Sequence, residues 1–141
     1  MLASWDSHWM REAQLISERS KDPSTKCGAC IVDEKNRLVS KGYNGFPRKA
    51  RDDVSLYADR EIKYRRIIHA EMNAILFAQR DLTGCALYVW PFLTCDRCAT
   101  YVVQSGIIRV IAPSSDNPRW ADAFKVALEL YAETGVDVSF C

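Results

Sequence analysis

Two short motifs in this chain carry side chains that can bind a transition metal and move protons. His69 and Glu71 are two residues apart at the head of the apolar segment IIHAEMNAILFA, residues 67–78, and LTCDRCA contains Cys95 and Cys98 as a C-x-x-C. Cysteines three apart at the start of a helix share one face, so both sulfurs can reach one ion. Zinc accepts thiolate and imidazole ligands together, and two cysteines with one histidine leave a fourth position for water. The two motifs predict a catalytic zinc site.

Each of these residues alone also has an ordinary structural explanation. A lone C-x-x-C can be a redox pair or two buried thiols, a histidine at a helix start can be a cap, and Glu71 could simply complement the helix dipole. The combination favours a metal site, because helix N-termini stabilise thiolates. Zinc lowers the pKa of bound water to about 7, and Glu71 could take that proton and deliver it to a leaving group.

The elements that must position these residues alternate between helix and strand. Expected helices cover residues 5–20, 69–80, 94–106 and 119–135, with a short helical turn at 61–65. Expected strands cover residues 30–33, 37–43, 85–90, 107–112 and 136–140, and the polar segment 45–58 is expected to be a surface loop. This order predicts the α/β class, with one mixed sheet covered by helices on both faces.

Length and composition predict one globular domain spanning residues 1–141. Apolar residues make up 48% of the 141 residues and charged residues 26%, and the net charge is only +1, which disfavours a long nucleic-acid partner. The six cysteines occur without a signal peptide, so we expect a reducing, cytoplasmic location. No run approaches the roughly 18 apolar residues of a membrane span.

Four segments resemble the deoxycytidylate deaminase family: DPSTKCGACIVDE, GYNGFP, HAEMNAILFA and TCDRCA. The similarity runs from about residue 5 to 135, and H-x-E with a downstream C-x-x-C is the signature of the zinc-dependent nucleobase deaminases. The resemblance implies a cytidine-deaminase-like, three-layer α/β/α sandwich with a five-stranded mixed sheet. It also implies zinc-dependent hydrolysis of dCMP to dUMP and ammonia. Alternative substrates are dCTP, deoxycytidine, guanine or a tRNA adenosine.

The resemblance also assigns roles to individual residues. Glu71 would protonate N3 of the ring and assist ammonia to leave. Asn44 would hydrogen-bond the sugar, the backbone of Ala70 would meet the base carbonyl, and the Leu93 carbonyl would receive the departing amino group. The family's zinc ligands fall on the three residues already singled out: His69, Cys95 and Cys98.

A nucleotide substrate needs a cation for its phosphate. The segment SSDNPRW, residues 114–120, follows a predicted strand, and open α/β sheets bind ligands at that edge. Arg119 could contact the phosphate through two hydrogen bonds and Trp120 could cover the base, although a surface arginine and a core tryptophan are equally ordinary there. Lys26, Arg48 and Lys63 are rival candidates for the phosphate, and Lys26 is also counted among the predicted substrate contacts.

The chain departs from the family pattern at three places. Thr94 replaces the proline that usually precedes the first cysteine, and its hydroxyl is expected to cap the helix. Residues 45–66 contain no Cys or His, so the second, structural zinc of some relatives is not expected. Arg48 stands where a glycine often follows GYNGxP in the family, which argues against the family's allosteric nucleotide site, so dCTP and dTTP, which regulate some relatives, are candidate effectors only. The resemblance also predicts a homo-oligomer.

A structural zinc module without catalysis is a competing interpretation. It requires a fourth protein ligand, which would have to come from Cys27, Cys30 or Cys85. The remaining cysteine, Cys141, is expected to be an incidental thiol.

Overall fold

A computed structural model of the chain describes residues 2–141. The helices are α1 (Trp5–Ser17), α2 (Val54–Ala58), α3 (Arg60–Arg66), α4 (Ala70–Ala78), α5 (Asp96–Gln104) and α6 (Ala121–Thr134). The strands are β1 (Gly28–Val32), β2 (Leu38–Tyr43), β3 (Ala86–Trp90), β4 (Arg109–Ala112) and β5 (Asp137–Phe140). Within residues 2–141, no helix is both long enough and apolar enough to cross a bilayer.

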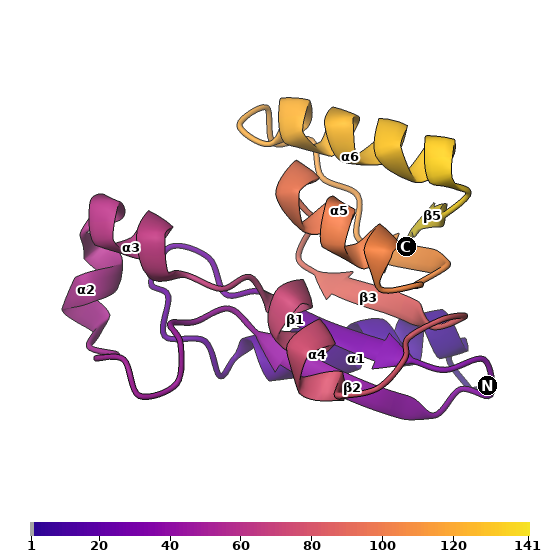
Figure 1. Cartoon of the computed structure of the whole chain (residues 1–141), viewed down its shortest axis with the longest axis horizontal. Helices are drawn as coiled ribbons and strands as arrows, with labels where there is room; N and C mark the ends of the chain where they lie inside the picture. Colours follow the sequence, from indigo (N-terminus) through magenta and orange to yellow (C-terminus); the bar gives the residue numbers. More distant parts are fainter. Residues whose placement is uncertain (1) are drawn as a thin grey trace.

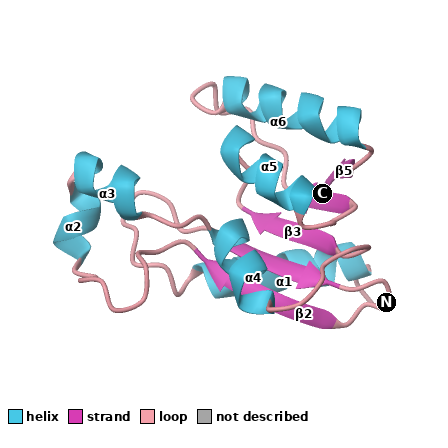
Figure 2. Cartoon of the chain, in the orientation of Figure 1, coloured by secondary structure: helices cyan, strands magenta, loops and turns pink. Residues whose placement is uncertain are grey.

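The strands form one mixed sheet in the order β2-β1-β3-β4-β5 (Figures 1 and 2). Strand β1 is antiparallel to both β2 and β3, whereas β3, β4 and β5 run parallel. The two parallel connections pass through α5 and α6, because parallel neighbours need a crossover. The sequence-based prediction of a five-stranded mixed sheet is confirmed.

Helices cover both faces of this sheet. Gly28 on β1 lies against α1, since an added Cβ would be 2.0 Å from the Ala13 carbonyl oxygen. Gly42 on β2 pairs with the next β1 residue, Ala29, and its added Cβ would be 2.6 Å from the Ala74 nitrogen of α4. Successive residues of a strand face opposite sides, so α1 and α4 lie on opposite faces. The predicted three-layer α/β/α sandwich is confirmed.

The core has one apolar cluster on each face of the sheet. The α1 side contains Trp9, Met10, Ala13, Cys30, Val32, Tyr88 and Ile111. The opposite side is larger and joins alternate strand residues to α4, α5 and α6 through residues such as Ile31, Leu87, Val102, Val110 and Tyr131. Strand β1 is buried along its whole length, so it connects the two clusters.

The main error in the sequence-based prediction is the segment 45–58, which was expected to be a loop but contains α2. Tyr57 of α2 is 2% exposed and its ring stacks on Phe46 at 4.1 Å. Its hydroxyl donates to Asp52 and accepts from the Phe46 amide. A helix of one turn depends on such tertiary contacts more than on propensity. The predicted helical turn at 61–65 is part of α3, which Asp59 caps.

Helix α1 is fixed to the sheet by a charged cluster around Asp6. The two carboxylate oxygens of Asp6 accept hydrogen bonds from Arg109 of β4 at 2.9 and 2.6 Å, and Oδ1 also accepts from the Tyr88 hydroxyl at 2.7 Å. The Arg109 hydrogen bonds hold the pKa of Asp6 below its ordinary value of 3.8. The ionised carboxylate therefore stabilises the attachment of α1.

We predict that Asp6→Asn lowers the free energy of unfolding at pH 7 by about 1 kcal/mol. This is the contribution expected of a bidentate ion pair, reduced because the pair is partly exposed to solvent. A carboxylate with a lowered folded-state pKa stabilises the protein above its unfolded pKa and loses this effect as pH falls through the folded value. The difference between wild type and variant should therefore shrink below about pH 3.8. Urea unfolding of wild type and variant at pH 7 and pH 3 measures the difference in unfolding free energy and its dependence on pH. A difference that does not change with pH would contradict the ion-pair explanation.

Candidate metal centre and active site

The metal centre is assembled by the N-termini of two helices on the same side of the sheet. His69 is the residue immediately before α4, and Cys95 is the N-cap of α5, with Cys98 in its first turn. The Nδ1 atom of His69 lies 3.5 Å from Cys95 Sγ and 3.3 Å from Cys98 Sγ. The two motifs separated by 26 residues along the chain therefore meet in space.

The three donors fit a zinc ion. Their ligand atoms all lie within 4.8 Å of one another. In a tetrahedral site with Zn–S of 2.3 Å and Zn–N of 2.0 Å, donor atoms are about 3.5–3.8 Å apart, close to the spacing of His69 from each thiol. Within residues 2–141, the group contains three His, Cys, Asp or Glu donors. A fourth protein ligand, which the structural-module interpretation requires, is not part of it.

Hydrogen bonds among the three donors shift their pKa values. The hydrogen bond between the two thiols lowers the pKa of Cys95 and raises the pKa of Cys98. The same Cys95 thiolate, by its hydrogen bond, raises the pKa of His69 to about 9. Zinc requires deprotonated ligands, so binding at this group is coupled to proton release.

Glu71 lies beside the donors and is almost fully buried. It occupies the first turn of α4, is 5% exposed, and has its Oε1 3.6 Å from His69 Nδ1. Burial raises the pKa of Glu71, because a low-dielectric site disfavours the charged form. A carboxyl group with a raised pKa next to a metal site can accept a proton and pass it on.

One cavity of about 190 Å³ extends from this centre to the residues that lead into α6. His69, Glu71 and Cys95 line it, and so do Arg119 and Trp120. Trp120 and Phe92 pack with their ring centroids 5.6 Å apart, which gives the cavity an aromatic wall. The cavity therefore offers a reactive centre, a flat apolar surface and a cation to one ligand.

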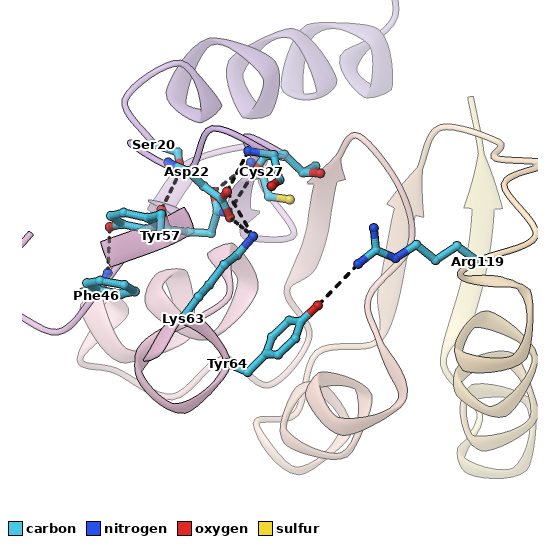
Figure 3. A network of polar contacts seen from close by, with 11 residues as sticks. Ser20, Asp22, Cys27, Phe46, Tyr57, Lys63, Tyr64 and Arg119 are labelled. Atoms are coloured by element: carbon cyan, nitrogen blue, oxygen red, sulfur yellow. Dashed lines mark hydrogen bonds and ion pairs between the residues drawn. The ribbon is translucent and has the colours of Figure 1, made fainter. Parts of the chain in front are cut away.

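A buried polar network supports another wall of the cavity (Figure 3). Lys63 of α3 pairs with Asp22 at 2.9 Å, and Asp22 is 2% exposed. The Asn44 side chain donates to the Thr25 carbonyl and to Asp22, and its Oδ1 accepts from the Cys27 amide. The network fixes α3 to residues 20–27, and the charge of Lys63 is neutralised by Asp22.

Two arginines that line the cavity have no such partner. Within residues 2–141, neither Arg60 nor Arg119 forms an ion pair with a carboxylate. Arg119 instead donates to the Tyr64 hydroxyl at 3.4 Å, as Figure 3 shows, and its guanidinium lies 4.8 Å from the Trp120 ring centre. These cations are available for an anionic ligand.

Most of the predicted substrate contacts line the cavity. Asn44, Ala70, Leu93, Arg119 and Trp120 do so. Lys26 does not: it is exposed and outside the lining. The competing cations also separate, because Lys63 lines the cavity whereas Arg48 lies 6.0 Å from the ring centre of Phe77.

Other features of the site were not expected. Helix α5 is capped by the Cys95 sulfur, which accepts from the Cys98 amide, and not by Thr94. Asp22, Arg60 and Tyr64 line the cavity without having been singled out. Asp22 was available as a signal, since it belongs to the segment DPSTKCGACIVDE that resembles the family, but no role was assigned to it. Arg60 and Tyr64 belong to the α2–α3 region, where the sequence pattern is weakest.

Comparisons with known proteins agree with this site. Residues 3–113 match the family described as the cytidine and deoxycytidylate deaminase zinc-binding region. An uncharacterized deaminase encoded in the luxG 3′ region of Aliivibrio fischeri is 39% identical, over 99% of this chain and 95% of that protein. The human deoxycytidylate deaminase is also 39% identical, over 94% of this chain and 76% of its own length.

Solved structures confirm the fold. A dCMP deaminase from the cyanophage S-TIM5 superimposes with a TM-score of 0.77 over 100% of both chains, at 20% sequence identity. The fold and the three-donor centre together define a zinc-dependent deaminase. The chain belongs to the cytidine and deoxycytidylate deaminase family.

Proposed function

We propose that this protein hydrolyses dCMP to dUMP and ammonia, and that residues 1–141 act as one deaminase domain. The observation that carries the proposal is that one cavity contains both chemical parts of such a site. His69, Cys95 and Glu71 line it, and so do Arg119 and Trp120. Two relatives support the substrate: the human protein is a deoxycytidylate deaminase, and the cyanophage enzyme was solved with dCMP and dUMP.

In this proposal His69, Cys95 and Cys98 hold the zinc ion, which when bound supplies an activated nucleophile for the amino-bearing carbon. Glu71 delivers a proton to N3 of the ring and then to the leaving ammonia. Its burial and raised pKa support this role.

Backbone groups at the helix start and in the preceding loop hold the base. The Ala70 amide is the first of α4 and has no partner within the helix, so it can donate to the base carbonyl. The Leu93 carbonyl can accept from the amino group that leaves. Asn44 is proposed to contact the sugar, with its amide oriented by the Thr25 carbonyl and the Cys27 amide.

The phosphate is proposed to bind Arg119, and Arg60, which also lines the cavity, is a second candidate cation. A guanidinium can donate two parallel hydrogen bonds to phosphate. Lys63 is a poorer candidate because Asp22 already neutralises it. The Tyr64 hydroxyl orients Arg119 towards the cavity, where both residues are part of the lining.

We predict that Arg119→Ala raises the KM for dCMP by about 10- to 100-fold, because the variant loses a charge-assisted hydrogen bond to the phosphate. The same variant should leave the much weaker turnover of deoxycytidine, which lacks the phosphate, unchanged. Arg66→Ala is the matched control, since Arg66 is exposed on α3 and outside the cavity. An equal loss on both substrates would contradict the phosphate assignment.

A substrate panel tests the proposal as a whole. Ammonia release is measured with dCMP, dCTP, deoxycytidine, guanine and a tRNA substrate, and we expect the highest kcat/KM for dCMP. Preferential turnover of any other member would overturn the substrate assignment while leaving the deaminase family intact. The net charge of +1 gives no support to tRNA as the substrate.

Assembly, regulation and location are also proposed from the family resemblance. We propose a homo-oligomer, and Leu76 and Phe77 of α4 supply exposed apolar surface for it, at 56% and 51% exposure. Light scattering measures the subunit number. Binding of dCTP or dTTP as effectors is tested by assaying dCMP turnover in their presence. A cytoplasmic location stays a prediction.

A further inference from the structure

The loop that delivers Cys95 to the metal centre has few attachments of its own. Residues 91–94 connect β3 to the N-cap of α5, and Leu93 and Thr94 are only 2% and 1% exposed. Outside the strand ladders, one hydrogen bond within residues 2–141 involves this loop. That bond is made by the side chain directly preceding Cys95.

The single bond joins two buried hydroxyl groups. Thr94 Oγ1 lies 2.6 Å from the hydroxyl of Tyr131, which belongs to α6 and is 0% exposed. Each hydroxyl is the other's side-chain partner, and a buried hydroxyl left without a partner costs about 1–3 kcal/mol. The pair is therefore a fixed link between α6 and the residue next to Cys95.

Aromatic packing holds the same loop against the same helix. The Phe92 ring lies 5.6 Å from Trp120 and 5.7 Å from Phe124 between ring centroids. Phe124 and Tyr131 are seven residues apart on α6, which places them on one face of the helix. Phe92 and Thr94 thus attach to α6 on both sides of Leu93.

We infer that Thr94 and Tyr131 are positioning residues for the metal centre. Their bond sets the direction of the loop just before Cys95, and so fixes where the Cys95 sulfur and the Leu93 carbonyl lie relative to His69. This inference rests on the proposed role of Cys95 as a zinc ligand but not on the identity of the substrate. Groups that orient metal ligands typically change metal affinity or activity 10- to 100-fold when removed.

The test compares Thr94→Val and Tyr131→Phe, which each remove one hydroxyl and keep most of the packing. Zinc affinity is measured by competition with a chelator, and the spectrum of the cobalt-substituted protein reports the geometry of the thiolate ligands. Each single variant should bind zinc about tenfold more weakly. Thr94→Ser, which keeps the hydroxyl, should bind as wild type does.

The double variant Thr94→Val/Tyr131→Phe separates positioning from stability. Neither hydroxyl is then left unpaired, so the unfolding midpoint should recover towards that of wild type. Zinc affinity should stay about tenfold weaker than in wild type, because each single variant already breaks the Thr94–Tyr131 hydrogen bond and the second substitution removes nothing further. Tyr101→Phe is the control, since it removes the hydroxyl of a tyrosine that is 49% exposed on α5.

Unchanged zinc affinity and cobalt spectra in all three variants, with a lower midpoint in the single ones, would overturn the inference and leave the pair a purely structural bond. If Thr94→Val does not fold, Tyr131→Phe gives the same measurement. Cys95→Ser distinguishes failure of the proposed metal site from failure of the positioning role. If Cys95→Ser retains zinc, the proposed metal site itself is wrong. If Cys95→Ser loses zinc while Thr94→Val binds it normally, only the positioning role is wrong.

Discussion

Replacing Glu71 by Gln should abolish ammonia release from dCMP while leaving one zinc ion bound per chain. The amide has nearly the same shape as the carboxylate but cannot accept and return a proton. Positioned proton transfer contributes about 10²–10⁴-fold to rate, and here one group serves several proton transfers, so we expect kcat to fall by at least about a thousandfold. Ammonia release and metal content by atomic absorption measure the two effects.

The control for this variant is Glu61→Gln on α3, where the carboxylate is solvent-exposed and outside the cavity. It should retain full activity. Substantial turnover by the Glu71 variant would remove the proposed mechanism. Loss of zinc together with activity would instead identify Glu71 as a ligand.

The metal centre was predictable from the sequence because its chemistry is concentrated in short spacings. His69 with Glu71, and Cys95 with Cys98, each lie within one helical turn, so local geometry fixes most of their arrangement. What local geometry could not fix was that the two helix starts would meet. The alternation of helices and strands indicated this meeting, because it predicted that β3 follows α4 and precedes α5 along the chain and that all three belong to one layered α/β domain.

The end of the cavity proposed to bind the phosphate was only partly predictable. Arg119, which lines the cavity, was predicted because it follows β4 at the carboxyl edge of the parallel strands, where such folds bind ligands. Lys26 belongs to a segment of equally suitable sequence, yet its side chain is exposed and outside the cavity. Spacing along an irregular loop does not determine which side a residue faces, whereas spacing along a strand or helix does.

Long-range side-chain pairs were the least predictable features. The short helix α2 depends on stacking between Phe46 and Tyr57, which are 11 residues apart. The Thr94–Tyr131 bond joins residues 37 apart, and the sequence suggested a local cap instead. A capping preference is an average over many helices, and here the buried α6 hydroxyl is the partner that the threonine has in the folded protein.

Cys98→Ser is expected to remove zinc from the protein and with it the activity. Cys98 is 4% exposed, and its sulfur lies 3.3 Å from His69 Nδ1. A serine hydroxyl stays protonated at neutral pH and is a poor zinc ligand beside a thiolate and an imidazole. If about 10–16 kcal/mol of binding free energy is shared by a zinc site's ligands, losing one of three costs about 4 kcal/mol, which weakens zinc binding about a thousandfold.

Cys85→Ser provides the matched control, because Cys85 is also buried, at 1% exposure, but is not part of the donor group. Both substitutions place a hydroxyl in the protein interior, so the cost in folding is comparable, while only the Cys98 variant should lose metal. The measurement is zinc content after dialysis against a weak chelator, followed by dCMP turnover with zinc restored. Full zinc occupancy in the Cys98 variant would show that the ion is held elsewhere, and equal metal loss in both variants would show that the loss does not come from removing a ligand.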